Sequence, residues 1–221
     1  MNGYRLLVFD WDGTLMDSEA RIVACLQAAA VDVGIAVPPP DSARDVIGLG
    51  LQEAIERLFP GVDRRALGRL VERYRHHFLG DHPTASELFP GVVETLEGLA
   101  DAGYLLGIAT GKSRRGLDKV LSETGLGRFF HASRCADEAF SKPHPRMLEE
   151  VMAVLGASPA DTLMIGDTEY DMQMARSAGV PAVAVSYGVH APERLLAEGA
   201  LACLDRIDEL PGWLAGQPAA A

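Results

Sequence analysis

The sequence has few cysteines, few lysines and no long apolar run. Its three cysteines, Cys25, Cys135 and Cys203, are far apart and show no CxxC spacing, so neither a disulfide framework nor a zinc site is indicated. No uncharged apolar run reaches the roughly 18 residues that a membrane-spanning helix needs. The N-terminal residues also lack the pattern of a secretory signal. These absences lead us to expect a cytoplasmic protein with reduced thiols.

Positive charge is also scarce. Twenty Lys and Arg residues face 31 Asp and Glu residues, which gives a net charge of −11. Such a field repels nucleic acids and anionic membranes, so we expect neither as a partner. With 48% hydrophobic and 23% charged residues, the composition is that of a globular protein with enough apolar material for a large core.

Four short apolar runs have the length of strands that are buried on both faces. They cover residues 6–9, 105–109, 162–166 and 181–185. Helical patterns lie between them, at residues 92–102, 116–123, 145–155 and 172–178. This alternation predicts an α/β fold with a doubly wound parallel sheet, whose ligands gather at the carboxyl ends of the strands.

One long segment interrupts the alternation. It has helical patterning at residues 19–30, 51–59 and 65–78, a predicted loop at Pro38 to Pro40, and no convincing buried strand. We therefore predict an α/β core domain formed by residues 1–15 and 89–221. Residues 16–88 are predicted to form an inserted helical domain.

Polar clusters directly follow three of the predicted strands, at residues 10–14, 110–112 and 166–171. In the first cluster Asp10 and Asp12 lie two residues apart, and close carboxylates repel each other unless a cation lies between them. Together with Asp167 from another strand end, they would offer the oxygen ligands that suit Mg²⁺. For each acid alone a turn or a helix cap is the preferred explanation, but the combination favours a site.

With residues 10–15 as a first motif, the chain resembles the haloacid dehalogenase superfamily. Thr110 matches the second motif of that family, Lys142 the third, and Asp167 with Asp171 the fourth. The helical insert follows the first motif, as in the branch that carries a cap there. The resemblance covers nearly the whole chain and implies a Rossmann-like core with a helical cap.

The resemblance also implies roles for individual residues in the hydrolysis of a phosphate monoester. Asp10 would attack phosphorus and form an aspartyl-phosphate. Asp12 would protonate the leaving alcohol and then deprotonate the hydrolytic water, and its backbone carbonyl would bind Mg²⁺ with the carboxylates of Asp10 and Asp167. Lys142 and the Thr110 hydroxyl would stabilise charge on the transferred phosphoryl group.

Supporting roles are expected for residues near these motifs. Asp171 is predicted to act on a neighbouring ligand rather than to bind the metal, and Thr14 to orient the Asp10 loop. Lys112 is assigned to its loop rather than to the chemistry. Arg44 and Arg57 are candidates for binding a second anionic group of the substrate.

Other reactions of the superfamily fit less well. A dehalogenase does not need Asp12, and a phosphonatase needs a lysine in the cap, where residues 16–88 contain none. A β-phosphoglucomutase-like enzyme usually has a histidine where this chain has Ile22, which weakens that alternative without excluding it. An inactive regulatory binding module would be expected to lack Asp10.

Among phosphatases, the sequence is most similar to phosphoglycolate phosphatases. The similar segments are Asp17-Ser18, Gly48-Leu49-Gly50 and Ser186-Tyr187-Gly188. Pyrophosphatases and sugar-phosphate phosphatases share them, so these substrates remain alternatives. The predicted partner is a small phosphorylated metabolite, and the predicted state is a monomer or homodimer.

Overall fold

A six-stranded parallel sheet organises the structure, a computed structural model that describes residues 3–80 and 83–217. The strand order is β5-β4-β1-β6-β7-β8, and each neighbouring pair is parallel. The strands are β1 (Leu6–Phe9), β4 (Leu105–Thr110), β5 (Ala132–Cys135), β6 (Thr162–Gly166), β7 (Ala182–Val185) and β8 (Cys203–Leu204). The predicted doubly wound α/β sheet is confirmed, and the chain changes winding direction beside β1, where such sheets bind ligands.

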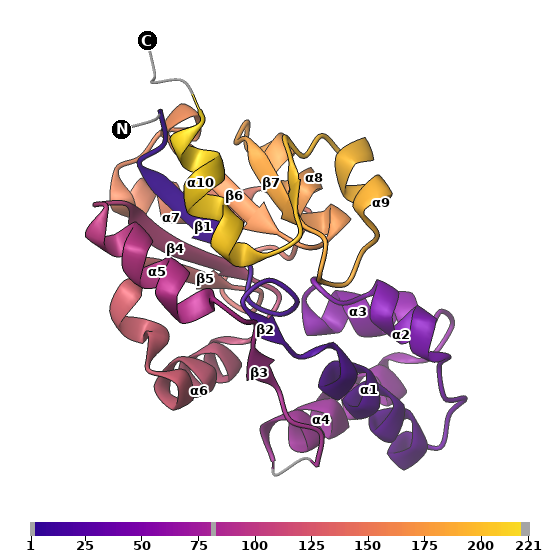
Figure 1. Cartoon of the computed structure of the whole chain (residues 1–221). Helices are drawn as coiled ribbons and strands as arrows, with labels where there is room; N and C mark the ends of the chain where they lie inside the picture. Colours follow the sequence, from indigo (N-terminus) through magenta and orange to yellow (C-terminus); the bar gives the residue numbers. More distant parts are fainter. Residues whose placement is uncertain (1–2, 81–82, 218–221) are drawn as a thin grey trace.

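Helices cover both faces of this sheet (Figure 1). They are α5 (Val92–Asp101), α6 (Arg114–Thr124), α7 (Arg146–Leu155), α8 (Glu169–Ser177), α9 (Pro192–Ala197) and α10 (Leu210–Ala215). Alternate residues of β1 point to opposite faces: Leu7 and Phe9 pack with α5, α6 and α10, whereas Leu6 and Val8 pack with α7, α8 and α9. Burial on both faces explains why the central strands are continuous apolar runs.

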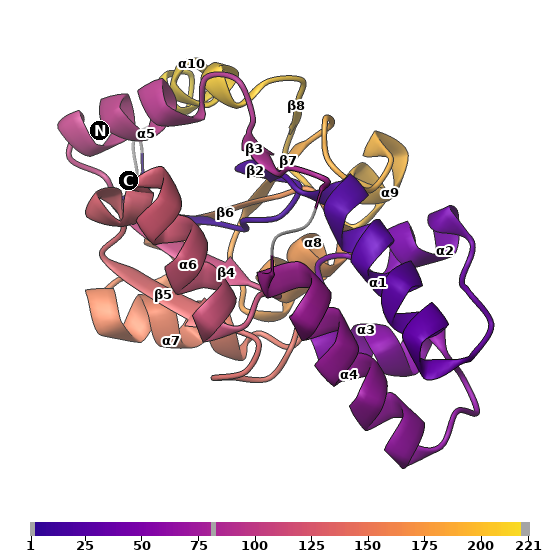
Figure 2. The ribbon, with the colours of Figure 1, turned by 90° about the horizontal axis from the view of Figure 1, so that it is seen from below.

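The helical insert has an apolar core of its own. It contains α1 (Glu19–Val33), α2 (Pro40–Asp45), α3 (Leu51–Leu58) and α4 (Arg64–Leu79), and it is flanked by the antiparallel strands β2 (Met16–Asp17) and β3 (Glu87–Leu88). Figures 1 and 2 place these helices together at one end of the core, with α1 beside α4. This arrangement supports the predicted core and cap, whose boundaries stay a prediction; residues 1–2, 81–82 and 218–221 of those ranges lie outside the described residues.

Several elements differ from the sequence-based expectation. Pro40 begins α2 instead of ending the loop, because proline fits the first turn of a helix, where its missing N–H is not needed. The strands β5 and β8 were not predicted, since β5 is short and only partly buried and β8 has two residues. Among the described residues, no helix is long and apolar enough to cross a membrane.

Candidate active site

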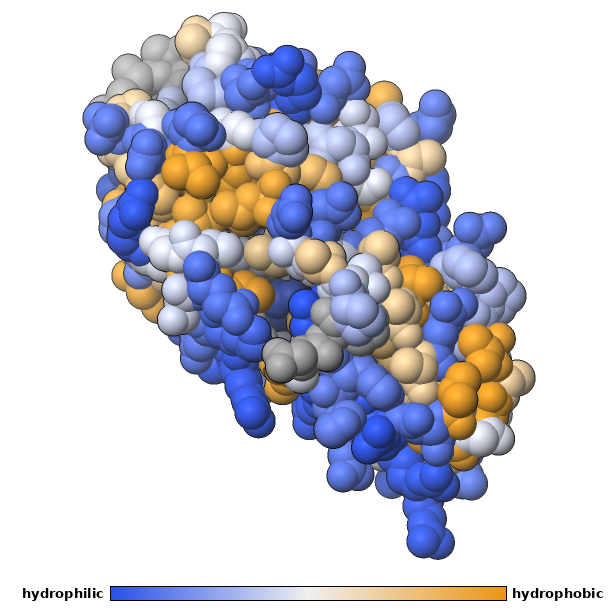
Figure 3. Space-filling model, turned by 60° about the horizontal axis from the view of Figure 1, so that its bottom comes forward, coloured by the Kyte–Doolittle hydropathy of each residue, from blue (hydrophilic) through white to orange (hydrophobic). Residues whose placement is uncertain are grey.

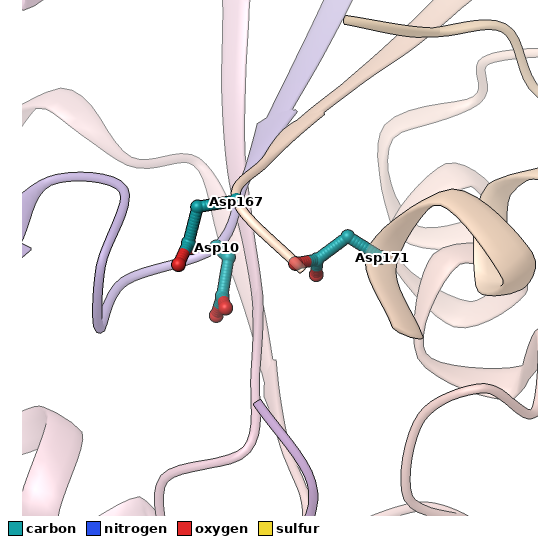
Figure 4. A group of neighbouring side chains, drawn as sticks. All are labelled: Asp10, Asp167 and Asp171. Carbon is teal, nitrogen blue, oxygen red and sulfur yellow. The ribbon is translucent and has the colours of Figure 1, made fainter. Parts of the chain in front are cut away.

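Three acidic side chains converge at the carboxyl ends of the central strands. Asp10 follows β1, Asp167 follows β6, and Asp171 lies in the first turn of α8 (Figure 4). Each offers a carboxylate oxygen, and these three oxygens lie within 4.8 Å of one another. Because β1 and β6 are neighbours in register, the sheet brings together acids that are 157 residues apart in the sequence.

Lys142 supplies positive charge to this acidic cluster. Its side chain is fully buried, and Nζ lies 2.8 Å from Asp10 Oδ1 and 2.6 Å from Asp171 Oδ1. Burial alone would lower the lysine pKa, but the two carboxylates raise it above its usual value. Lys142 is therefore an ammonium ion held between Asp10 and Asp171.

One ammonium does not balance three buried carboxylates. Burial raises the pKa of Asp10 to about 7, with Lys142 lowering it and Asp171 raising it. Burial, Asp10 and Asp171 also raise the pKa of Asp167 well above its usual value. Asp10 Oδ2 has no hydrogen-bond partner among the described residues. A buried oxygen without a donor and an excess of negative charge are the conditions that a bound cation relieves.

Hydrogen bonds fix the other two acids. Thr14 Oγ1 donates to Asp167 Oδ1 at 2.7 Å, and the Val189 N–H donates to Asp167 Oδ2 at 2.9 Å. Asp171 Oδ2 accepts from the N–H and the hydroxyl of Thr168 in a capping box that begins α8. Thr14 therefore links the loop after Asp10 to Asp167, and Asp171 contacts Lys142.

The Asp12 carboxyl group does not join the three converging acids. Lys112 Nζ lies 2.8 Å from Asp12 Oδ1 and 3.0 Å from Oδ2, and the Ser18 hydroxyl donates to Oδ1 at 2.5 Å. The sequence-based assignment of Lys112 to its loop did not anticipate this contact with Asp12. A buried carboxylate needs a charged or polar partner. Asp12 and Lys112 are 100 residues apart in the sequence, so no local sequence pattern indicated that they pair.

A cavity of about 210 Å³ lies between the core and the helical insert. Asp10, Asp12, Thr110 and Lys112 line its core side. Its cap side is mainly apolar and includes Ile22, Leu26, Ile47, Leu49, Tyr74 and Phe78. Figure 3 shows a hollow with hydrophilic residues near the centre of one face, and a broad hydrophobic area above it.

The arginines singled out from the sequence lie elsewhere. Arg44 pairs with Glu19 at 3.1 Å and Arg57 lies 3.9 Å from Asp45, and neither lines the cavity. Arg75 on α4 does line the cavity, and no local sequence pattern distinguishes Arg75 from the seven other arginines of the insert. The prediction for Arg44 and Arg57 fails because sequence alone does not show which helix face meets the core.

The glycine-rich segment of residues 48–50 brings cap backbone onto the core. A Cβ at Gly111 would lie 2.5 Å from Leu49 O, and the Gly50 N–H donates to Ser141 Oγ at 2.7 Å. This segment therefore contacts the loops that carry Thr110 and Lys142, beyond connecting two helices. Gly111, between Thr110 and Lys112, leaves the space that this contact needs.

Comparison with known proteins agrees with this geometry. A family model described as haloacid dehalogenase-like hydrolase matches residues 7–185. The chain belongs to this family. The haloacid dehalogenase-like hydrolase family thus accounts for most of the sequence, including the insert and all the acids described above.

Individual relatives of this haloacid dehalogenase-like hydrolase carry phosphatase names. The protein named Probable phosphatase IndB from Dickeya dadantii is 35% identical over 94% of this chain and 92% of its own. A phosphoglycolate phosphatase from Agrobacterium fabrum is 33% identical over 83% of this chain and 81% of its own. The crystal structure of a haloacid dehalogenase-like hydrolase from Bacteroides fragilis is 26% identical and superposes with a TM-score of 0.87, covering 94% of this chain and 99% of that one.

Proposed function

We propose that this protein is a Mg²⁺-dependent phosphatase that hydrolyses small phosphate monoesters through an aspartyl-phosphate on Asp10. The observation that carries the proposal is the buried cluster of Asp10, Asp167 and Asp171, which has an excess of negative charge and from which Asp10 lines the cavity. Asp12 lines the same cavity from a separate position, so the nucleophile and the acid/base are different groups. The phosphatase names of the relatives support the same reaction.

The residues present fit a magnesium ion. Carboxylate oxygens are ligands that Mg²⁺ prefers, and Asp10 Oδ2 accepts no hydrogen bond from the described residues. We assign the carboxylates of Asp10 and Asp167 and the backbone carbonyl of Asp12 as its ligands. When bound, the ion would neutralise charge on the acids and on the phosphoryl oxygens. Asp171 Oδ1 lies 2.6 Å from the Lys142 ammonium, so we assign Asp171 to the positioning of Lys142.

The chain's own residues then divide the reaction into two steps. A carboxylate oxygen of Asp10 bonds to phosphorus while the bond from phosphorus to the alcohol oxygen breaks, and Asp12 gives its proton to that oxygen. Water next attacks phosphorus, Asp12 takes its proton, and the bond to Asp10 breaks to release inorganic phosphate. Lys142 and the Thr110 hydroxyl stabilise charge on the peripheral oxygens in both steps.

The size and lining of the cavity support a small substrate. About 210 Å³ with a largely apolar cap side suits a compact alcohol better than a large polyhydroxylated one. We propose a phosphoglycolate-phosphatase-like specificity, with the enzyme acting in the cytoplasm as a monomer or homodimer. Pyrophosphatase, sugar-phosphate phosphatase and β-phosphoglucomutase-like activities are the enzymatic alternatives. An inactive regulatory binding module is the non-enzymatic alternative.

A substrate panel tests this proposal directly. Purified protein would be assayed with p-nitrophenyl phosphate, phosphoglycolate, pyrophosphate, sugar phosphates and nucleotides, each with Mg²⁺ and with EDTA, and ranked by kcat/KM. We expect Mg²⁺-dependent release of phosphate, highest for a small monoester. Absence of turnover on the whole panel would instead favour the binding module.

A second experiment tests the intermediate. Enzyme quenched with acid during turnover of a radiolabelled substrate should carry label on Asp10, in a bond that hydroxylamine cleaves. Beryllium fluoride, which mimics an aspartyl-phosphate, should bind at Asp10 together with Mg²⁺. Label on another residue, or steady turnover without any acyl-bound label, would contradict the mechanism.

A further inference from the structure

The Asp12 carboxyl group is held from two sides by donors of different segments. Lys112 reaches both of its oxygens from the loop after β4, at 2.8 and 3.0 Å. Ser18 reaches Oδ1 from the segment that leads into the helical insert. Ser18 occupies the N-cap position of α1, yet its side chain makes no capping hydrogen bond. A serine at that position usually caps its helix, so its hydroxyl here serves Asp12 instead.

The Lys112 side chain is confined between the core and the cap. It is buried, and Nζ lies 4.6 Å from the centroid of the Phe78 ring on α4. The Arg21 guanidinium also lies near that ring, with Cζ 5.3 Å from the centroid. The Lys112 ammonium thus has a carboxylate on its core side and an aromatic face on its cap side. A flexible lysine in such a place is fixed by contacts at its tip.

Position matters for Asp12 because proton transfer requires its carboxyl oxygen within hydrogen-bond reach of the reacting oxygen. We propose that Lys112 is the positioning residue of Asp12: by pairing with Asp12 and packing on Phe78, it holds the carboxyl group over the cavity while the cap covers it. This inference rests on the proposed function, since it requires that Asp12 transfers protons. Lys112 acts on the reaction only through Asp12.

A leaving-group comparison separates this role from substrate binding. p-Nitrophenolate leaves without help, whereas the alkoxide of phosphoglycolate needs a proton from Asp12. For Lys112→Met we therefore expect kcat/KM to fall about 10- to 100-fold for phosphoglycolate, and less than about threefold for p-nitrophenyl phosphate. The inhibition constant of inorganic phosphate should not change. Lys119→Met is the matched control, because Lys119 is a more exposed lysine that pairs with Glu123 on α6, and it should change neither value.

A double-mutant cycle gives the decisive reading. If Lys112 acts through Asp12, Lys112→Met should cause no further loss in an Asp12→Asn background. An equal loss in both backgrounds would overturn the inference. So would an unchanged leaving-group ratio, or a rise in KM for phosphoglycolate that persists without Asp12, which would make Lys112 a direct ligand of the substrate.

Lys112→Arg guards against a folding defect in the methionine variant. It keeps the charge and donors, so we expect folded protein with kcat/KM for phosphoglycolate between the wild-type and Met values, and again no effect in the Asp12→Asn background. A loss of the same size in that background would count against the inference. Failure of the proposed function looks different, because the wild-type enzyme would then lack turnover on both substrates.

Discussion

Gly13 and Asp167 lie so close that a Cβ on Gly13 would fall 2.1 Å from Asp167 Oδ2. Gly13 also has a φ of +82°, a conformation that other residues adopt only with strain. The turn after β1 can therefore approach the acid after β6 only because no side chain stands between them. This approach brings the Asp10 loop and Asp167 to one site.

Gly13→Ala should weaken the site and the fold together. We expect a loss of about 2 to 4 kcal/mol in the free energy of unfolding and a higher Mg²⁺ concentration for half-maximal activity, because Asp167 must move. Gly34→Ala is the control: Gly34 has a φ of +78° with no atom within 4 Å of the added Cβ, so it should cost only about 1 kcal/mol. Urea unfolding and Mg²⁺ titration of activity would be measured for both variants. Equal losses in Gly13→Ala and Gly34→Ala would show that the close approach of Gly13 to Asp167 does not matter.

Asp10→Asn removes the proposed nucleophile. We expect kcat to fall by a factor of at least about 10⁴, since a carboxamide cannot form the acyl-phosphate. The protein should still fold, because Asn has nearly the same size as Asp. The substitution also removes one negative charge from a site where three buried carboxylates face one ammonium. Steady-state kinetics and thermal unfolding would test this, and retained turnover would remove Asp10 as the nucleophile.

The stability of the metal-free protein should fall as the pH rises. The pKa of Asp10 is raised from 3.8 to about 7 by burial, so the folded state holds this proton more tightly than the unfolded state. Its contribution to stability is complete below 3.8 and is lost as the pH rises through about 7. The raised pKa of Asp167 acts in the same direction.

Stabilisation by Mg²⁺ should follow the opposite trend, because the ion binds the ionised acids. We expect MgCl₂ to raise Tm more at about pH 8 than at about pH 5. Calorimetry in EDTA and in MgCl₂ across this range would measure both trends. In Asp10→Asn the Mg²⁺ effect should shrink, and an equal rise in Tm at both pH values in the wild type would contradict the assignment.

Asp171→Asn should lower activity while the protein still folds. The Asn oxygen can still accept the capping hydrogen bonds of α8, but the Asn NH2 group then faces the Lys142 ammonium, so we expect the helix to form and the free energy of unfolding to fall by about 1 to 3 kcal/mol. Lys142 would lose a charged partner and its fixed position, which should lower kcat about 10- to 100-fold. Asp161→Asn, in the exposed capping box with Ser158, is the control and should leave kcat unchanged. Equal kcat values for the two variants would refute this role for Asp171.

Arg75 should contribute to specificity if the substrate carries a second anionic group. Arg75 and Lys112 are the arginine and lysine side chains that line the cavity among the described residues, and Lys112 is paired with Asp12. Arg75→Ala should raise KM for phosphoglycolate about tenfold and leave KM for p-nitrophenyl phosphate unchanged. Arg73 lies on the same helix as Arg75 and pairs with Asp32, so Arg73→Ala is the control and should change neither KM. A parallel rise for both substrates would reject this assignment.

The sequence predicted the central sheet because its strands carry an unmistakable local pattern. Residues 6–9 are an uninterrupted apolar run, residues 162–166 contain Leu, Met and Ile in succession, and both segments are strands at those positions. The edge strand β5 was missed because Ala132–Cys135 contains Ser and Arg, which solvent at the sheet edge tolerates. Local composition thus identifies elements that are buried on both sides and loses those that are half exposed.

The chain by itself determined which acids come after strands, because the motif of residues 10–15 and Asp167 stand at recognisable strand ends. Only the tertiary structure decided the partner of each charge. Lys142 lies between Asp10 and Asp171, Lys112 pairs with Asp12, and Arg75 rather than Arg44 reaches the cavity. These pairings join residues far apart in the chain, and they depend on strand order, helix rotation and the approach of the cap, none of which a local pattern encodes.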